Sequence, residues 1–354
     1  MEAWTAGGGR RRSRRQRWRT RALPAALLAG LLAPAAGFQT GGHYDTVRSV
    51  LGSAVTAPDD RQRIEAFCAE LPDLSSELDA ITQRVDVLLR EPGIGWGLQG
   101  RCAGPVSQHM VRSQFFLHAL TGLEVPQARA SAGILIQRVN ARIGQATQDR
   151  QPPRVLANLY CERGFALHLL ADTYAHADLH HPGQLYRTGL GHFRDLAEPD
   201  YMMRRQAPAY AAQDLWQSLV QQLARAWPPG EGRFEAAPAL AASDRLSTND
   251  RQHGDTAETE QDLSRLLEDA LPPAWNRPPL PDGRNRLGLQ TQGCAQQARS
   301  YLTAAGVPPD RQPDCQQVWD AYLQDAQAAF PAHYRPAASC DIGPAGTPVH
   351  DPLR

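Results

Sequence analysis

The sequence contains no lysine, so all 37 of its basic residues are arginine, against 37 aspartates and glutamates. It also has no long run in which valine, isoleucine or tyrosine alternates with polar residues, and such runs are the main signal of β-strands. No two cysteines stand in a CxxC arrangement, which argues against a thiolate zinc site, and no internal repeat is present. These absences predict an all-α fold and direct the search for chemistry to histidines and carboxylates.

The first 37 residues have the composition of a targeting segment. Residues 10–22 hold eight arginines, and the apolar stretch LPAALLAGLLAPAAG follows and ends in small residues. This order is typical of a secretory signal peptide, and the apolar run is short and proline-interrupted for a membrane span. We therefore predict a signal peptide over 1–37, a mature chain that starts at Phe38, and export to the periplasm or the exterior; an uncleaved N-terminal anchor is the alternative.

Cleavage changes the charge of the protein. The signal segment holds eight arginines and one acid, Glu2, so the mature chain keeps 29 basic and 36 acidic residues, a net charge of −7. Non-specific nucleic-acid binding depends on neutralising phosphates with basic side chains. The mature charge therefore argues mildly against nucleic acid as the partner, although local arginine clusters can override it.

All six cysteines follow the predicted cleavage point, and in an exported protein cysteines form disulfides by default. Six cysteines allow fifteen pairings, among which the sequence does not choose. We expect Cys294, Cys315 and Cys340 to bond among themselves or to Cys102.

Helical spacing of apolar residues recurs along the chain, and the most apolar stretch on all sides, 154–177, is expected to be the central helix. Ser75 or Ser76 is placed to cap a helix that follows. After residue 228 the composition becomes rich in proline and glycine. We predict a helical domain over 38–228 and a Pro-rich helical region over 229–354 that packs on it or caps it. The expected helices are 59–71, 75–89, 107–122, 125–147, 154–177 and 207–227, with shorter ones at 259–270 and 315–330.

Within the central helix, His168, Asp172 and His176 are spaced four residues apart among apolar neighbours. Positions four apart differ by only about 40° around a helix and about 6 Å along it, so the three side chains project from one side. Burying a lone carboxylate is costly, and a metal ion offsets that cost because carboxylate oxygen and imidazole nitrogen are zinc ligands. An exposed polar stripe or a buried His–Asp pair is the alternative interpretation.

Further histidines and aspartates with apolar neighbours recur along the chain. His118 ends the apolar helix QFFLHALTG, and His43 lies five residues after Phe38. Single ligands from several helices, added to the central helix, would build a multinuclear site between them. The other candidates are Asp73 or Asp79 at the start of the second helix, and His192 with Asp195, Glu198 and Asp200 close behind it.

In this order the residues resemble the zinc-dependent phospholipase C and single-strand nuclease superfamily, in a bacterial branch with an HxxxDxxxH motif. The resemblance covers roughly 38–205 and implies an all-helical, secreted phosphodiesterase with up to three zinc ions. In that family the mature N-terminal residue binds one zinc through its main chain, with a histidine close behind, which matches Phe38 and His43. The resemblance assigns the next ligands to Asp73, with Asp79 as the alternative, then to His118 in preference to His109, and to His168 and Asp172.

The last ligands implied by the resemblance are His176, His192 and Asp200, with Asp195 as the alternative carboxylate. The interval from Asp172 to the next histidine is shorter than in better-known members, so His180 or His181 can also fill the place of His176. In those members the final carboxylate stands four residues after the final histidine. Four residues after His192, this chain has Leu196.

The resemblance implies that Asp172 bridges two zinc ions that hold an activated hydroxide, and that Asp73 is both a ligand and a proton acceptor. We therefore expect a zinc-dependent phosphodiester hydrolase of the phospholipase C type, acting on a phospholipid or another phosphodiester and contacting a membrane surface. The alternatives are a single-strand nuclease of the same fold and a non-catalytic metal-binding envelope protein.

Overall fold

The computed structural model describes residues 42–55, 59–90, 105–181, 183–188 and 212–225 and, with short gaps, 227–240 and 279–331. Of these residues 71% are helical and none forms a strand beyond isolated bridges, so the fold is all-α, as predicted. None of the described helices has the length and hydropathy to span a membrane. The helices are α2 (Gly42–Ala54), α3 (Asp60–Leu74), α4 (Ala80–Arg90), α5 (Pro105–Phe116), α6 (Val125–Gln148), α7 (Pro153–Ala175), α8 (Ala212–Arg225), α11 (Cys294–Ala304) and α12 (Cys315–Ala329), with a 3₁₀ turn, η5 (Pro309–Arg311).

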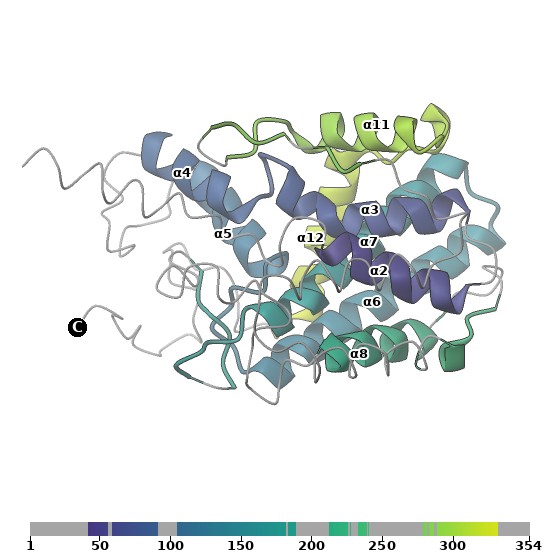
Figure 1. The fold of residues 1–354 in the computed structure, drawn as a ribbon, viewed down its shortest axis with the longest axis horizontal. Coiled ribbons are helices and arrows are strands. Elements are labelled where there is room, and N and C mark those ends of the chain that lie inside the picture. The colour runs from purple at the N-terminus through teal and green to yellow at the C-terminus, as the bar shows by residue number, and fades with distance from the viewer. Residues whose placement is uncertain are drawn as a thin grey trace, which may run out of the picture. The chain divides into compact units, whose positions relative to one another are not determined.

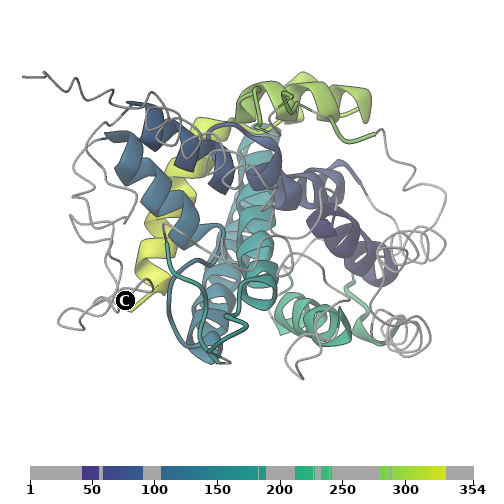
Figure 2. The same ribbon diagram turned by 60° about the vertical axis from the view of Figure 1, so that its left-hand side comes forward.

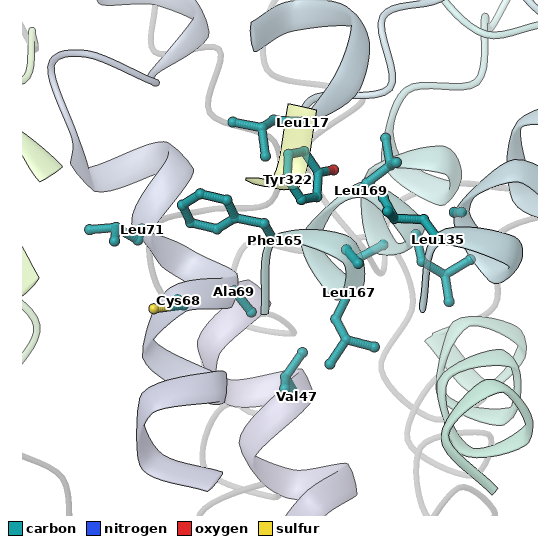
Figure 3. Close-up of a cluster of buried hydrophobic side chains, with 14 of the residues drawn as sticks. Val47, Cys68, Ala69, Leu71, Leu117, Leu135, Phe165, Leu167, Leu169 and Tyr322 are labelled. Carbon is teal, nitrogen blue, oxygen red and sulfur yellow. The ribbon is translucent and has the colours of Figure 1, made fainter. Parts of the chain in front are cut away.

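Helix α7 is the central element, as its apolar sequence predicted. Every residue from 159 to 175 is buried, and α7 packs mainly against α3 and α6, with α12, α8 and α2 also in contact (Figures 1 and 2). Figure 3 shows its side chains directed to different neighbours: Phe165 lies towards Leu71 of α3 and Tyr322 of α12, and Leu167 towards Val47 of α2. The Phe165 and Tyr322 rings meet edge to face, 5.5 Å apart. Chemistry on α7 is therefore enclosed by other helices.

Helix α3 differs from the prediction at its C-terminal end. A capping box begins this helix: the Asp59 side chain accepts a hydrogen bond from the Arg61 amide, and the Gln62 side chain accepts one from the Asp59 amide. It continues past Pro72 to Leu74, since burying Leu71 and Leu74 outweighs the one hydrogen bond that proline removes. The sequence placed the break at residue 71.

The next helix consequently starts later than predicted. Helix α4 begins at Ala80, and Asp79 caps it by accepting from the Thr82 amide at 2.7 Å. The prediction that Ser75 or Ser76 caps a helix over 75–89 is therefore wrong. Asp73 lies in the last turn of α3 and not at a helix start.

Two further predicted helices end early, and two helices were not predicted. Helix α5 stops at Phe116, so His118 lies in the turn that follows it, next to Ala119 with a φ of 50°. Helix α7 stops at Ala175, so His176 is its C-cap residue and not part of the helix. Helices α2 and α11 were missed, and the predicted helix 259–270 lies outside the described residues. Helices α6, α8 and α12 start or end within five residues of the predicted bounds.

The C-terminal region packs on the rest of the described chain. Helix α11 contacts α3, and α12 contacts α6 and α7. Buried residues from both parts join one hydrophobic cluster. The division at 228/229 itself stays a prediction.

Two disulfides link the described helices. Cys68–Cys161 joins α3 to α7, and Cys294–Cys315 joins α11 to α12. The second pairing is one of those expected, whereas Cys102 and Cys340 lie outside the described residues. Disulfides form and persist in oxidising compartments, which indicates an oxidising environment for this protein.

Candidate metal centre

Six of the predicted ligands converge at one place beside α7. They come from four helices and the turns at their ends, and each side chain is at most 2% exposed. The six are His43 in the first turn of α2, Asp73 in the last turn of α3, His118 in the turn after α5, His168 and Asp172 on α7, and His176 at its C-cap.

Asp172 lies at the centre of this cluster. Its Oδ1 is 3.1 Å from Nε2 of His43, and its Oδ2 is 3.3 Å from Nδ1 of His118 and 3.2 Å from Nε2 of His168. Nδ1 of His176 is 3.7 Å from the same Oδ2. The two oxygens of one carboxylate therefore face different histidines.

Asp73 repeats this arrangement from α3. Its Oδ2 is 3.5 Å from Nε2 of His43, and its Oδ1 is 3.7 Å from Nδ1 of His118. Both carboxylates thus turn one oxygen towards His43 and the other towards His118. The sequence predicted a bridging position for Asp172 alone, and the structure places Asp73 in an equivalent position.

Backbone carbonyls orient three of the histidines. His168 Nδ1 donates to the Ala69 carbonyl at 2.7 Å, His118 Nε2 donates to the Leu78 carbonyl at 2.9 Å, and His176 Nδ1 donates to the His118 carbonyl. A carbonyl can only accept, so the ring nitrogen it contacts carries the proton and the other nitrogen is left to bind a metal. The atoms that could bind a metal are therefore Nε2 of His168, Nδ1 of His118 and Nε2 of His176.

The spacing of three ligand atoms matches that of a tetrahedral metal. Asp172 Oδ2, His118 Nδ1 and His168 Nε2 lie 3.2–3.3 Å from one another. A tetrahedron with metal–ligand bonds of about 2.0–2.1 Å has edges of about 3.3 Å between its ligands. His176 contributes less directly, because the nitrogen nearest Asp172 is the one bonded to the His118 carbonyl.

Burial and charge separate the proton affinities of the two carboxyls. Burial raises the pKa of Asp73 well above its usual range, and the charges of Glu70 and Asp172 raise it further. Burial also acts to raise the pKa of Asp172, but His176, His168 and His43 outweigh it and hold that pKa well below its usual range. Burial, with the His43 charge, lowers the pKa of His168 to about 3, so this ring is neutral at pH 7. An ionised Asp172 beside a neutral His168 is the form that binds metal.

Both oxygens of Asp73 and both of Asp172 are buried and make no hydrogen bond of good geometry within the described part of the chain. Buried carboxylates of this kind are rare unless a cation compensates them. Two groups have ligand atoms within 4.8 Å of one another, His43 with His168 and Asp172, and Asp73 with His118 and His168. The cluster can therefore hold a metal ion.

The remaining predicted residues do not join this cluster. Asp79 is buried as the cap of α4, and His109 contacts the Glu77 carbonyl through Nε2 at 2.7 Å. His180 and His181 are exposed, which argues against either as the replacement for His176. Phe38, His192, Asp195, Glu198 and Asp200 lie outside the described residues, so the third ligand set stays a prediction.

Two residues that support the cluster were missed in the sequence. Glu70 accepts from the Tyr44 amide at 3.0 Å, so it holds the start of α2 and with it His43. Its position one helical turn before Asp73 was a signal for it. Gln290 donates through Nε2 to the Asp73 carbonyl at 2.8 Å, and 217 residues of separation left no sequence signal.

Comparisons with protein-family models, with curated proteins and with solved structures found no match to this chain.

Proposed function

We propose that the protein is an exported, zinc-dependent phosphodiester hydrolase that cleaves a phospholipid at its headgroup, in the manner of a phospholipase C. The supporting observation is the pair of buried carboxylates, Asp73 and Asp172, each placed between His43 and His118 with ligand spacings suited to tetrahedral zinc. The order of these residues in the chain, which resembles the phospholipase C and nuclease superfamily, supports the choice of a phosphodiester as substrate.

In this proposal the cluster holds at least two ions. Asp73, His118, His168 and Asp172 surround one position, and His43 with the second oxygens of both aspartates lies at the other. The N-terminal residue Phe38 is proposed to complete the second position, and His176 with His192 and Asp200 a third. Zinc supplies Lewis acidity that activates water and stabilises charge on phosphate oxygens.

The protein's own side chains supply the proton chemistry. Asp73, which lies between His43 and His118, is the carboxylate proposed to accept a proton from an attacking water. Asp172, held ionised by the surrounding histidines, keeps the two ligand sets at a fixed separation. The carbonyls of Ala69 and Leu78 keep His168 and His118 in the tautomers that ligand binding requires.

One observation favours a second candidate, a metal-binding protein without catalysis. All six side chains of the cluster are at most 2% exposed, and a substrate must reach an ion directly to be hydrolysed. The net charge of the mature chain argues against the third candidate, a nuclease.

The test is a metal count on the purified chain together with hydrolysis assays on phosphatidylcholine vesicles and single-stranded DNA. Asp172→Asn keeps the size of the side chain but removes the charge shared by two ligand sets. We expect it to lose more than one zinc ion per chain and at least a thousandfold in phosphatidylcholine hydrolysis.

The matched control is Asp178→Asn, which alters an aspartate that pairs with a histidine at the surface, 3.0 Å from His181. This variant should keep full zinc and activity. A chain that binds zinc but hydrolyses neither phosphatidylcholine nor single-stranded DNA would establish the second candidate. An Asp172→Asn protein with unchanged zinc content would contradict the assignment of the cluster.

A further inference from the structure

Arg84 is a buried cation without a partner in the described chain. The residue is 8% exposed, and its Nε is buried with no hydrogen bond. Asp79 is the one described acid whose charge acts on it, and the two form no ion pair. A guanidinium taken out of water without a paired anion is costly, so a residue of this kind is a candidate for binding an anion.

The position of Arg84 places it near the metal cluster. It lies in the second turn of α4, after the cap residue Asp79. Leu78, the residue before Asp79, accepts a hydrogen bond through its carbonyl from His118 Nε2 at 2.9 Å. The negative charge of Asp79 also acts to raise the pKa of His118. Residues 78–84 thus connect the arginine to a proposed zinc ligand.

A second arginine lies at the same edge. Arg284 is bridged to Gln290 in an antiparallel arrangement, and Gln290 donates to the Asp73 carbonyl at 2.8 Å and to Thr82 Oγ1 at 3.0 Å. The positive charge of Arg284 acts on both Asp73 and Asp79. Segments far apart in the sequence therefore bring these two arginines to the turn between α3 and α4, and this part of the chain contacts the cluster through the Leu78 and Asp73 carbonyls.

We propose that Arg84, assisted by Arg284, recognises the phosphate oxyanion of the substrate at the α3–α4 edge of the metal cluster. This inference rests on the proposed function for its substrate class, a phosphodiester. A guanidinium donates two parallel hydrogen bonds to phosphate oxygens, which holds the group against the cluster in one orientation. Arg84 is thereby a recognition residue, and its unpaired burial is explained by the ligand.

The test uses the full chain as purified and inorganic phosphate as the probe, titrated by calorimetry at low ionic strength. Arg84→Met should weaken phosphate binding at least tenfold, and the phosphate affinity of Arg84→Lys should lie between those of Arg84→Met and the wild type. The control is Arg90→Met on the same helix, because Arg90 is 66% exposed and paired with Asp86. This control should bind phosphate as the wild type does.

A stability measurement separates recognition from a structural role. Removing an unpaired buried charge should leave the thermal midpoint of Arg84→Met at or above that of the wild type. A large fall in that midpoint would assign Arg84 to the fold and overturn the proposal. The proposal would also be overturned if Arg84→Met bound phosphate as tightly as Arg90→Met, or if the wild type did not bind phosphate.

The outcomes also separate this inference from the proposed function. Phosphate affinity that depends on Arg84, in a chain that hydrolyses neither lipid nor DNA, would keep the recognition site and refute the hydrolase. If the chain binds zinc and hydrolyses its substrate, and Arg84→Met binds phosphate as tightly as the wild type, the recognition site alone is refuted.

Discussion

At the scale of single residues, the helical spacing in the sequence predicted part of the candidate site. His168 and Asp172 share one side of α7, because they lie one turn apart within a regular helix. The same spacing placed His176 within the helix, whereas α7 ends at Ala175 and His176 joins the cluster from the C-cap. Asp73 was chosen from the resemblance. Its bridging position depends on the last turn of α3, which Pro72 concealed in the sequence.

A second buried carboxylate on α7, Glu162, has a testable pH dependence. Arg142 Nη1 donates to its two oxygens at 2.7 and 3.0 Å and to Asp325 at 2.7 Å. Burial raises the pKa of Glu162 to about 8, the Asp325 charge adds to the rise, and Arg142 opposes it. In the unfolded chain the same carboxyl loses its proton near the ordinary value of about 4.3.

The folded state thus holds a proton that the unfolded state releases, so Glu162 lowers stability progressively as the pH rises from about 4.3 to about 8. Glu162→Gln should match the wild type in thermal midpoint near pH 4 and exceed it increasingly up to pH 8. Glu124→Gln, at an exposed position before α6, is the control. A Glu162→Gln midpoint that follows the wild type in parallel at every pH would show that the carboxyl titrates normally.

At the scale of helices, the close approach of α3 and α7 holds the cluster together. A Cβ added at Gly164 would lie 2.5 Å from the Glu65 carbonyl oxygen and 2.9 Å from the Ala69 amide nitrogen, both backbone atoms. One turn further along α7, His168 donates to the carbonyl of the same Ala69. Gly164 therefore sets the separation at which Asp73 on α3 can face Asp172 on α7.

Gly164→Ala should force the two helices apart. We expect a loss of about 1–3 kcal/mol in the free energy of unfolding from overpacking. Zinc content should fall as well, because ligands from both helices separate. Denaturant unfolding and a metal count on the same preparation measure the two effects.

Gly133→Ala on α6 is the matched control, since its added Cβ would meet only the end of the Gln222 side chain, at 3.0 Å. It should be neutral or slightly stabilising, because alanine favours the helix more than glycine does. If Gly164→Ala kept both its stability and its zinc, the close approach would have no bearing on the site.

Helices were predictable where their own sequence decides them. The apolar residues of α7 are explained by burial on every side, and they identified it as the central helix. Helix α2 was missed because its polar residues suggest an exposed segment, yet Asp45, Arg48 and Ser49 are buried. Their burial depends on the packing of α2 against α3 and α8, and Asp45 and Arg48 form an ion pair within the helix. Apolar periodicity does not report such packing.

At the scale of the whole molecule, the metal cluster joins more elements than either of the two described disulfides does. Cys68–Cys161 ties α3 to α7, whereas the cluster adds α2 and the turn after α5 to the same two helices. Without an ion, Asp73 and Asp172 are buried near each other, and their oxygens accept no hydrogen bond of good geometry from the described residues. Metal binding should therefore contribute to stability as well as to chemistry.

Removing metal with a chelator should lower the thermal midpoint while both disulfides stay closed. A ligand present at a thousand times its Kd stabilises the folded state by about 4 kcal/mol. For a chain of this size that corresponds to roughly 6 °C. Zinc added back in excess should restore the midpoint, whereas magnesium should not, since imidazole ligands suit zinc.

Asp172→Asn should show almost no response to the chelator. If the wild type melted at one temperature with and without chelator, or Asp172→Asn responded as strongly, the buried carboxylates would have to be compensated by something other than metal.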